Sequence, residues 1–176
     1  LHKKFTSVQN VLSVLFSFNK DLHLCALLTY GCLLRPHREV RELTWGDFNA
    51  DLTRISLAGN RNKGKRNRII PVPDYVRQHL KGGGSQHNIF SGTVKPYNHF
   101  YFSLLWTRFK AAHPDVVAPG QTLYSLRHTG AIAVYEKTRN IKILQMVMGH
   151  ADMATSLTYL RGLELDNIDI SHLPDL

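Results

Sequence analysis

The stretch from Tyr124 to Tyr159 reads YSLRHTGAIAVYEKTRNIKILQMVMGHADMATSLTY. Its periodicity predicts two or three short helices, the first of which spans Arg127–Lys137. Asn140 is suited to cap a second helix, and Gly149 supplies a stop after it. Asp152 is suited to cap a third helix that carries the final tyrosine. The stretch therefore predicts a group of short helices packed against one another.

Three polar residues of this stretch come from the three predicted helices or from their ends. They are Arg127, His150 and Tyr159. Each has an ordinary explanation by itself, because a tyrosine on an apolar helix usually belongs to a core and a histidine after glycine can cap a helix. Arg127 can likewise pair with a carboxylate such as Glu136. Their placement on three packed elements favours a functional site over a plain helix bundle.

Length and composition limit the classes of protein to consider. The 176 residues predict one domain over residues 1–176 with a real core, and 43% hydrophobic and 20% charged residues are ordinary for a globular chain. The net charge of +9 indicates a polyanionic partner, although charge alone does not separate DNA from RNA or an acidic membrane. No apolar run reaches membrane-spanning length. Cys25 and Cys32 predict buried free thiols, which suits a cytoplasmic protein, and they form no metal pattern.

The region before this stretch predicts a helical core and a small sheet. An apolar helix is expected over residues 22–30, and residues 53–57 and 68–72 alternate as two strands. Thr6 to Gln9 has the pattern of a capping box for an earlier helix. The expected fold is therefore α+β and mainly helical, with a small antiparallel sheet near residues 47–72.

Three motifs in order give the chain a family resemblance. They are Leu126-Arg127-His128-Thr129, then Met148-Gly149-His150, then Tyr159 nine residues after that histidine. In this order and spacing they resemble the tyrosine recombinase family, the phage-type integrases that cut and rejoin DNA. The family usually has histidine three residues before its arginine, and here Tyr124 stands at that position.

Two more family features lie upstream. The first catalytic arginine of the family precedes a helix that carries glutamate, and Glu39 fits as the supporting carboxylate. The usual gap is three residues, whereas Arg35 lies four before Glu39, which leaves Arg38 as a competing candidate. We favour Arg35, since its Leu-Arg-Pro context matches and a helix start absorbs one extra residue easily. The family's catalytic lysine lies eight residues before a proline, and counting back from Pro71 gives Lys63.

The resemblance implies a role for each of these residues. Tyr159 would be the nucleophile that forms a covalent 3′-phosphotyrosine. Arg35 and Arg127 would hold the scissile phosphate, because a guanidinium forks onto two oxygens and keeps its charge. Lys63 would protonate the leaving 5′ oxygen, and His150 would bond the phosphate or the leaving group. Tyr124 can still donate a hydrogen bond, His128 has a structural role, and neither a metal nor a cofactor is required.

The resemblance also implies the wider setting. It predicts the catalytic domain of a site-specific recombinase from a phage or other mobile element, working as a homotetramer on double-stranded DNA. Nothing in the chain corresponds to the family's N-terminal core-binding domain, and the tail at residues 160–176 would dock onto a neighbouring subunit or fold back onto its own domain. Five basic residues are candidate DNA contacts: Arg38, Arg61, Lys65, Arg66 and Arg68.

Two other functions stay open at this point. A type IB topoisomerase would use the same tyrosine chemistry to relax DNA. A DNA-binding module that has lost catalysis would explain Tyr124 and the extra residue after Arg35.

Overall fold

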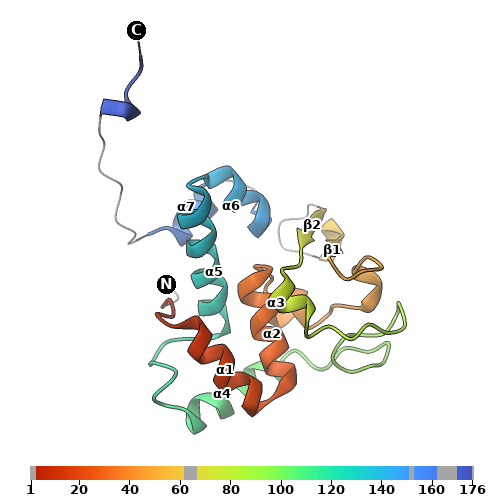
Figure 1. The fold of residues 1–176 in the computed structure, drawn as a ribbon. Helices are drawn as coiled ribbons and strands as arrows, with labels where there is room; N and C mark the ends of the chain where they lie inside the picture. Colours follow the sequence, from red (N-terminus) through yellow and green to blue (C-terminus); the bar gives the residue numbers. More distant parts are fainter. Residues whose placement is uncertain (1–2, 62–66, 151–152, 162–169, 176) are drawn as a thin grey trace.

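The computed structural model describes residues 3–61, 67–150, 153–161 and 170–175. Helix α5 runs from the end of the molecule formed by α1 and α4 to the end formed by α6 and α7, and the two strands lie to the side of α2 (Figure 1). The helices are α1 (Val8–Phe18), α2 (Lys20–Gly31), α3 (Asp74–Arg77), α4 (Tyr101–Ala112), α5 (Leu123–Thr138), α6 (Ile141–Met148) and α7 (Met153–Tyr159). The strands are β1 (Arg54–Leu57) and β2 (Arg68–Pro71), and a short π-helical turn, η1, spans Pro36–Val40.

Helix α2 is the centre of the main core. Its buried residues lie on all sides of the helix, as expected for an element surrounded by others, and α1, α4, α5 and η1 all pack against it. Gly130 allows α5 to approach closely, because a Cβ there would lie 2.4 Å from the carbonyl oxygen of Tyr30. This contact places the middle of α5 directly against the end of α2.

The predicted sheet is confirmed. β1 and β2 pair antiparallel, with Ile55 opposite Ile70 and Leu57 opposite Arg68. The residues of each strand alternate between buried and exposed. The mainly helical α+β fold is therefore the observed one.

The ends of the helices confirm some of the capping predictions. The Asn140 side chain accepts from the backbone N–H groups of Lys142 and Ile143 at the start of α6, and Gly149 ends that helix in the left-handed region with φ of 65°. The capping box predicted at Thr6 to Gln9 is wrong, because Ser7 is the N-cap of α1 and its side chain makes no cap bond. Asp152 lies outside the described residues.

A second, smaller core joins the end of α2 to the C-terminal helices. Leu33, Ala131, Leu144 and Met148 are buried together, and Tyr159 packs against them. Cys25 and Cys32 are buried free thiols, as predicted. Within the described ranges, no helix combines the length and the apolar character needed to cross a membrane.

Replacing His23 with glutamine is expected to reduce the loss of stability on acidification. Burial and, to a smaller extent, His79 lower the pKa of His23 from 6.5 to about 4. Between pH 6.5 and about pH 4, His23 binds a proton in the unfolded chain but not in the folded chain. The stability that the neutral His23 side chain contributes is therefore complete above about pH 6.5 and is lost as the pH falls toward about 4. Urea unfolding at about pH 7.5 and about pH 5 measures the difference. An equal loss of stability in both proteins would contradict the assignment to His23.

Candidate active site

Arg127 lies at the centre of the predicted site and is completely buried. Its Nε donates to the carbonyl of Leu33 at 2.7 Å, its Nη2 donates to the carbonyl of Met148 at 2.9 Å, and its Nη1 donates to Tyr159 Oη at 2.8 Å. Burial lowers the pKa of Arg127 to about 10, so the guanidinium stays charged at neutral pH. One arginine thus connects the end of α2, the end of α6 and the hydroxyl of α7.

The backbone of Leu33 adopts an uncommon conformation beside Arg127. Its φ of 54° lies in the left-handed region, which costs a residue with a side chain about 1 kcal/mol or more. The carbonyl of the same residue accepts from Arg127 Nε. The fold therefore maintains local strain at a residue that helps to hold the buried guanidinium.

The turn η1 explains the extra residue between Arg35 and Glu39. The Val40 N–H donates to the Arg35 carbonyl at 3.0 Å, and the Arg41 N–H donates to the Pro36 carbonyl at 3.3 Å. These bonds span five residues instead of the four of an α-helix, so the turn is one residue wider. The wider turn returns Glu39 to Arg35 despite the longer gap.

Glu39 holds Arg35 through two hydrogen bonds. Its Oε2 accepts from the Arg35 backbone N–H at 2.8 Å, and its Oε1 accepts from Arg35 Nη1 at 2.7 Å. Burial alone would raise the pKa of Glu39, but Arg68, Arg35 and Arg127 outweigh burial and lower it. Arg38 is exposed on the same turn. Arg35, and not Arg38, is therefore the arginine that the structure places beside Glu39 and Arg127.

Arg68 occupies a different place from the one predicted. The sequence analysis grouped it with the candidate DNA contacts, but only 5% of it is exposed. Its Nη1 donates to Glu39 Oε1 at 3.1 Å, and its Nη2 donates to the Val147 carbonyl at 2.9 Å. The side chain thus lies behind Arg35 and beside the end of α6.

Aromatic rings surround the tyrosine of α7. The ring of Tyr159 lies 5.1 Å from that of His150 and 5.7 Å from that of His128, measured between centroids. The Cζ atom of Arg127 lies 5.7 Å from the Tyr159 centroid. Tyr159 is partly exposed. Arg127 therefore holds the hydroxyl of a tyrosine that is not fully buried.

His150 is oriented by a residue that the sequence did not single out. Its Nδ1 lies 2.9 Å from Ser156 Oγ, and both side chains are buried. A partner on one ring nitrogen fixes the direction in which the other nitrogen points. Ser156 lies six residues after His150 and carries no motif, so only the packing of α7 identifies it.

Tyr124, at the position of the expected histidine, lies close to the same arginines. Burial raises the pKa of its phenol, while Arg35 and Arg127 lower it to a smaller extent. Its ring centroid lies 5.7 Å from that of His37. At neutral pH this phenol is protonated and can donate a hydrogen bond.

The remaining basic candidates fall in or near the hairpin. Arg61 is bound through Nη1 to Asp47 and through Nη2 to the Glu42 carbonyl at 3.0 Å. Lys63, Lys65 and Arg66 lie outside the described residues. The structure thus brings together Arg35, Glu39, Arg127, His150 and Tyr159, with Tyr124 and His128 beside them. Among the described residues no group of three or more histidine, cysteine or acidic side chains could hold a metal ion.

Comparison with known proteins gives a family model match over most of the chain. The model described as the phage integrase family matches residues 7–164. A tyrosine recombinase of Pseudothermotoga lettingae is 24% identical over 93% of this chain and 57% of its own length. Tyrosine recombinase XerA of Thermococcus onnurineus is 25% identical over 88% of this chain and 55% of its own length. The chain thus spans about half the length of the curated relatives that it matches.

Solved structures share the fold. A lambda integrase dimer bound to a COC′ core site aligns with a TM-score of 0.72 and 21% identity, over 96% of this chain and 51% of that one. XerA recombinase aligns with a TM-score of 0.71 and 15% identity, over 97% of this chain and 60% of that one. At these identities the structures support the fold and leave the chemistry to the residues described above.

Proposed function

Since this chain belongs to the phage integrase family, we propose that it is the catalytic part of a site-specific tyrosine recombinase that breaks and rejoins DNA. The hydrogen bond between Arg127 Nη1 and Tyr159 Oη supports this most directly, because it holds a hydroxyl nucleophile against a buried cation. Curated relatives are named tyrosine recombinases, and a similar fold occurs in a lambda integrase bound to DNA.

The proposed reaction proceeds in two transesterification steps. Tyr159 Oη gives up its proton to water and attacks the scissile phosphorus, a tyrosine–phosphate bond forms, and the bond to the 5′ oxygen breaks. Lys63, assigned from its place before Pro71, gives the leaving oxygen its proton. Arg35, Arg127 and His150 stabilise the charge that develops on the phosphate. The 5′ hydroxyl of another strand then attacks the phosphotyrosine and releases Tyr159, so rejoining needs no nucleotide cofactor.

The wider assembly is also part of the proposal. Joining two duplexes requires four active sites, so we expect a homotetramer on paired double-stranded DNA sites, acting in the cytoplasm for a phage or other mobile element. Residues 1–176 would be one catalytic domain, and the tail from residue 160 would dock onto a neighbouring subunit. The guanidiniums supply the positive charge that a divalent metal would otherwise bring, so no metal is required.

A covalent trapping experiment tests the proposed function. The probe is a pool of nicked duplexes with random sequence around the nick, in which the fragment released by cleavage diffuses away and rejoining is blocked. We expect a protein–DNA adduct that survives denaturation, with the nucleotide attached to Tyr159 in peptide mass spectra. Tyr159→Phe should give none, because the attacking oxygen is removed.

The other outcomes of this experiment identify the alternatives. Reversible binding without an adduct would indicate a DNA-binding module. Relaxation of a supercoiled plasmid that lacks the captured sequence would indicate a topoisomerase. Sequencing the trapped duplexes supplies the recognised site for the experiments below.

A further inference from the structure

We propose that Arg68 is a positioning residue that holds the first arginine and the histidine of the site in register, and that it does not contact DNA. The inference rests on the proposed function and assigns a role to a side chain whose sequence context indicated phosphate binding. Its side chain is only 4% exposed, and two of its nitrogens donate to protein groups. A guanidinium buried to this degree offers little surface to a phosphate.

Through its bond to Glu39, Arg68 affects the electrostatic potential at Arg35. Glu39 Oε1 accepts from Arg35 Nη1 at 2.7 Å and from Arg68 Nη1 at 3.1 Å. One buried carboxylate is thus shared by two guanidiniums, and the three groups carry a net charge of about +1. Without Arg68 the carboxylate would neutralise Arg35 alone, and Arg35 would offer less positive potential to a phosphate.

The bond to Val147 connects the same group to the end of α6. Arg68 Nη2 donates to the Val147 carbonyl at 2.9 Å, and Arg127 Nη2 donates to the Met148 carbonyl at 2.9 Å. The last carbonyls of a helix lack partners within the helix, so these two donors satisfy successive groups. His150 lies two residues after Met148, so its position depends on both Arg68 and Arg127.

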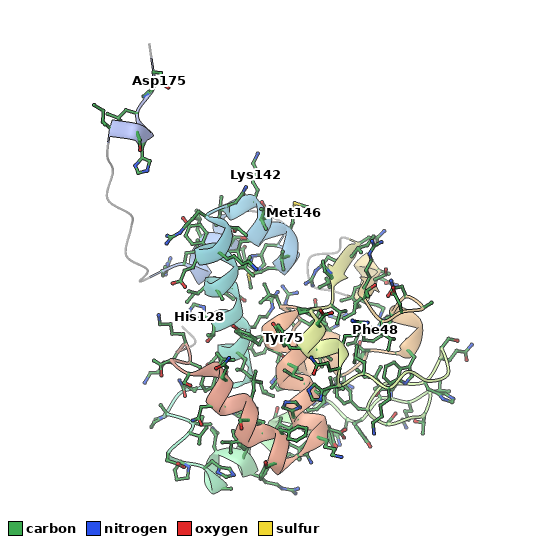
Figure 2. All side chains as sticks on the ribbon, viewed as in Figure 1. Phe48, Tyr75, His128, Lys142, Met146 and Asp175 are labelled. Atoms are coloured by element: carbon green, nitrogen blue, oxygen red, sulfur yellow. The ribbon has the colours of Figure 1, made fainter. Side chains whose placement is uncertain are left out.

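The space for Arg68 comes from the absence of a side chain at Gly149. A Cβ at that residue would lie 2.3 Å from Arg68 Cδ and 2.6 Å from Arg68 Nε. A cavity of about 770 Å³ between β2 and α6 is lined by Arg68, Gly149 and His150. Figure 2 shows Lys142 and Met146 projecting outward from α6. The Arg68 side chain thus extends from β2 to the end of α6, where it packs against Gly149 and is shielded from solvent.

The role predicts a split between DNA affinity and cleavage rate. Arg68→Met keeps the length of the side chain and removes its charge and donors. We expect the rate of cleavage of the captured duplex at saturating DNA to fall on the order of 10- to 100-fold. Losses of this size are typical of residues that orient the side chains binding a metal ion. The salt dependence of DNA binding should stay unchanged, because no phosphate contact is lost. Arg68→Lys should recover part of the rate by restoring the charge.

Two reference variants calibrate these measurements. Arg77→Met removes an exposed arginine of α3 that pairs with Asp74, and it should match the parent chain in every assay. Arg38→Met removes an exposed candidate phosphate contact and should lower the salt slope by about one. A drop of that size in Arg68→Met, with an unchanged rate at saturation, would show that Arg68 binds DNA and overturn the proposal. A parental rate in Arg68→Met would overturn it as well.

An observation without DNA separates this inference from the proposed function. The ring resonances of His150 should shift in Arg68→Met and remain in place in Arg77→Met, because α6 loses one of its anchors. If the parent chain forms no adduct, the recombinase function fails, and the His150 resonances still decide whether Arg68 positions the site. Unchanged resonances in both Arg68 variants would overturn the positioning role. If Arg68→Met does not fold, Arg68→Lys serves in the same comparisons.

Discussion

Arg127→Met is expected to reduce the rate of Tyr159-dependent cleavage by on the order of 1,000-fold. Removing one donor that stabilises developing charge typically costs about 100- to 1,000-fold in rate. Arg127 also holds Tyr159 Oη at 2.8 Å, so the nucleophile loses its orientation at the same time. Single-turnover cleavage of the captured duplex at saturating DNA measures the loss.

Arg127→Met should also destabilise the fold. The carbonyls of Leu33 and Met148 each lose a buried donor, and an unsatisfied buried group costs about 1–3 kcal/mol. Relief from burying the guanidinium offsets part of this loss. We expect a net loss on the order of 2 kcal/mol in urea unfolding, which leaves a folded protein for the kinetic assay.

Arg127→Lys is the matched control for the geometry of this residue. It keeps the charge but replaces a planar fork that reaches three acceptors with a single ammonium. Cleavage should remain at least about 100-fold below the parent, because one donor position cannot serve α2, α6 and Tyr159 together. A rate within about threefold of the parent would show that charge alone suffices at this site.

The sequence was sufficient to predict which helices meet. The periodicity identified α5, although the helix begins at Leu123, four residues before the predicted start. Asn140 and Gly149 identified the two ends of α6, and the spacing of the motifs predicted that the polar residues approach one another. The structure brings these residues together through Arg127. Local signals were adequate for α6 because its cap and its glycine stop both lie in the sequence next to the helix.

The turn after Arg35 was harder to predict. The sequence showed one residue too many before Glu39, and a pattern of residue types does not distinguish an insertion in a loop from a wider helical turn. The bonds from Val40 to Arg35 and from Arg41 to Pro36 resolve this, since they make η1 a π-helical turn. Such bonds depend on the packing of the turn against α2 and α4.

Arg68 was predicted to contact DNA because its charge was given more weight than its position on the buried face of β2. The residues of β2 alternate between buried and exposed, so Arg68 lies on the same face as Ile70, while Ile69 is 71% exposed. The two-residue period of a strand would have placed Arg68 toward the core. The partner that makes this burial acceptable, Glu39, lies 29 residues away and could not be inferred from the strand.

Gly149→Ala is expected to destabilise the protein by about 2–5 kcal/mol and to slow cleavage at least about tenfold. The φ of 65° costs alanine about 1–2 kcal/mol, and inserting a methyl group into packed surroundings adds about 1–3 kcal/mol. The added Cβ would lie 2.3 Å from Arg68 Cδ. Since Arg68 is bonded to both Glu39 and Val147, it cannot move aside without releasing one of them.

Gly82 provides a control for the cost of placing alanine in the left-handed backbone conformation. Its φ is 78°, and a Cβ there would meet no atom within 4 Å. Gly82→Ala should therefore show only the cost of the left-handed conformation, about 1–2 kcal/mol, with an unchanged cleavage rate. The difference between the two alanine variants in urea unfolding isolates the contact with Arg68.

A double variant tests whether that contact is the cause. Arg68→Ala removes the atoms that the methyl group added by Gly149→Ala would meet. The losses of stability from the two single variants should therefore sum to more than the loss in the double variant. Coupling of this sign requires that the two residues compete for the same space. Strict additivity, or equal losses in Gly149→Ala and Gly82→Ala, would show that Gly149 serves only as the stop of α6. The requirement for glycine before His150 would then come from the backbone alone, with no contribution from the arginine inserted beneath it.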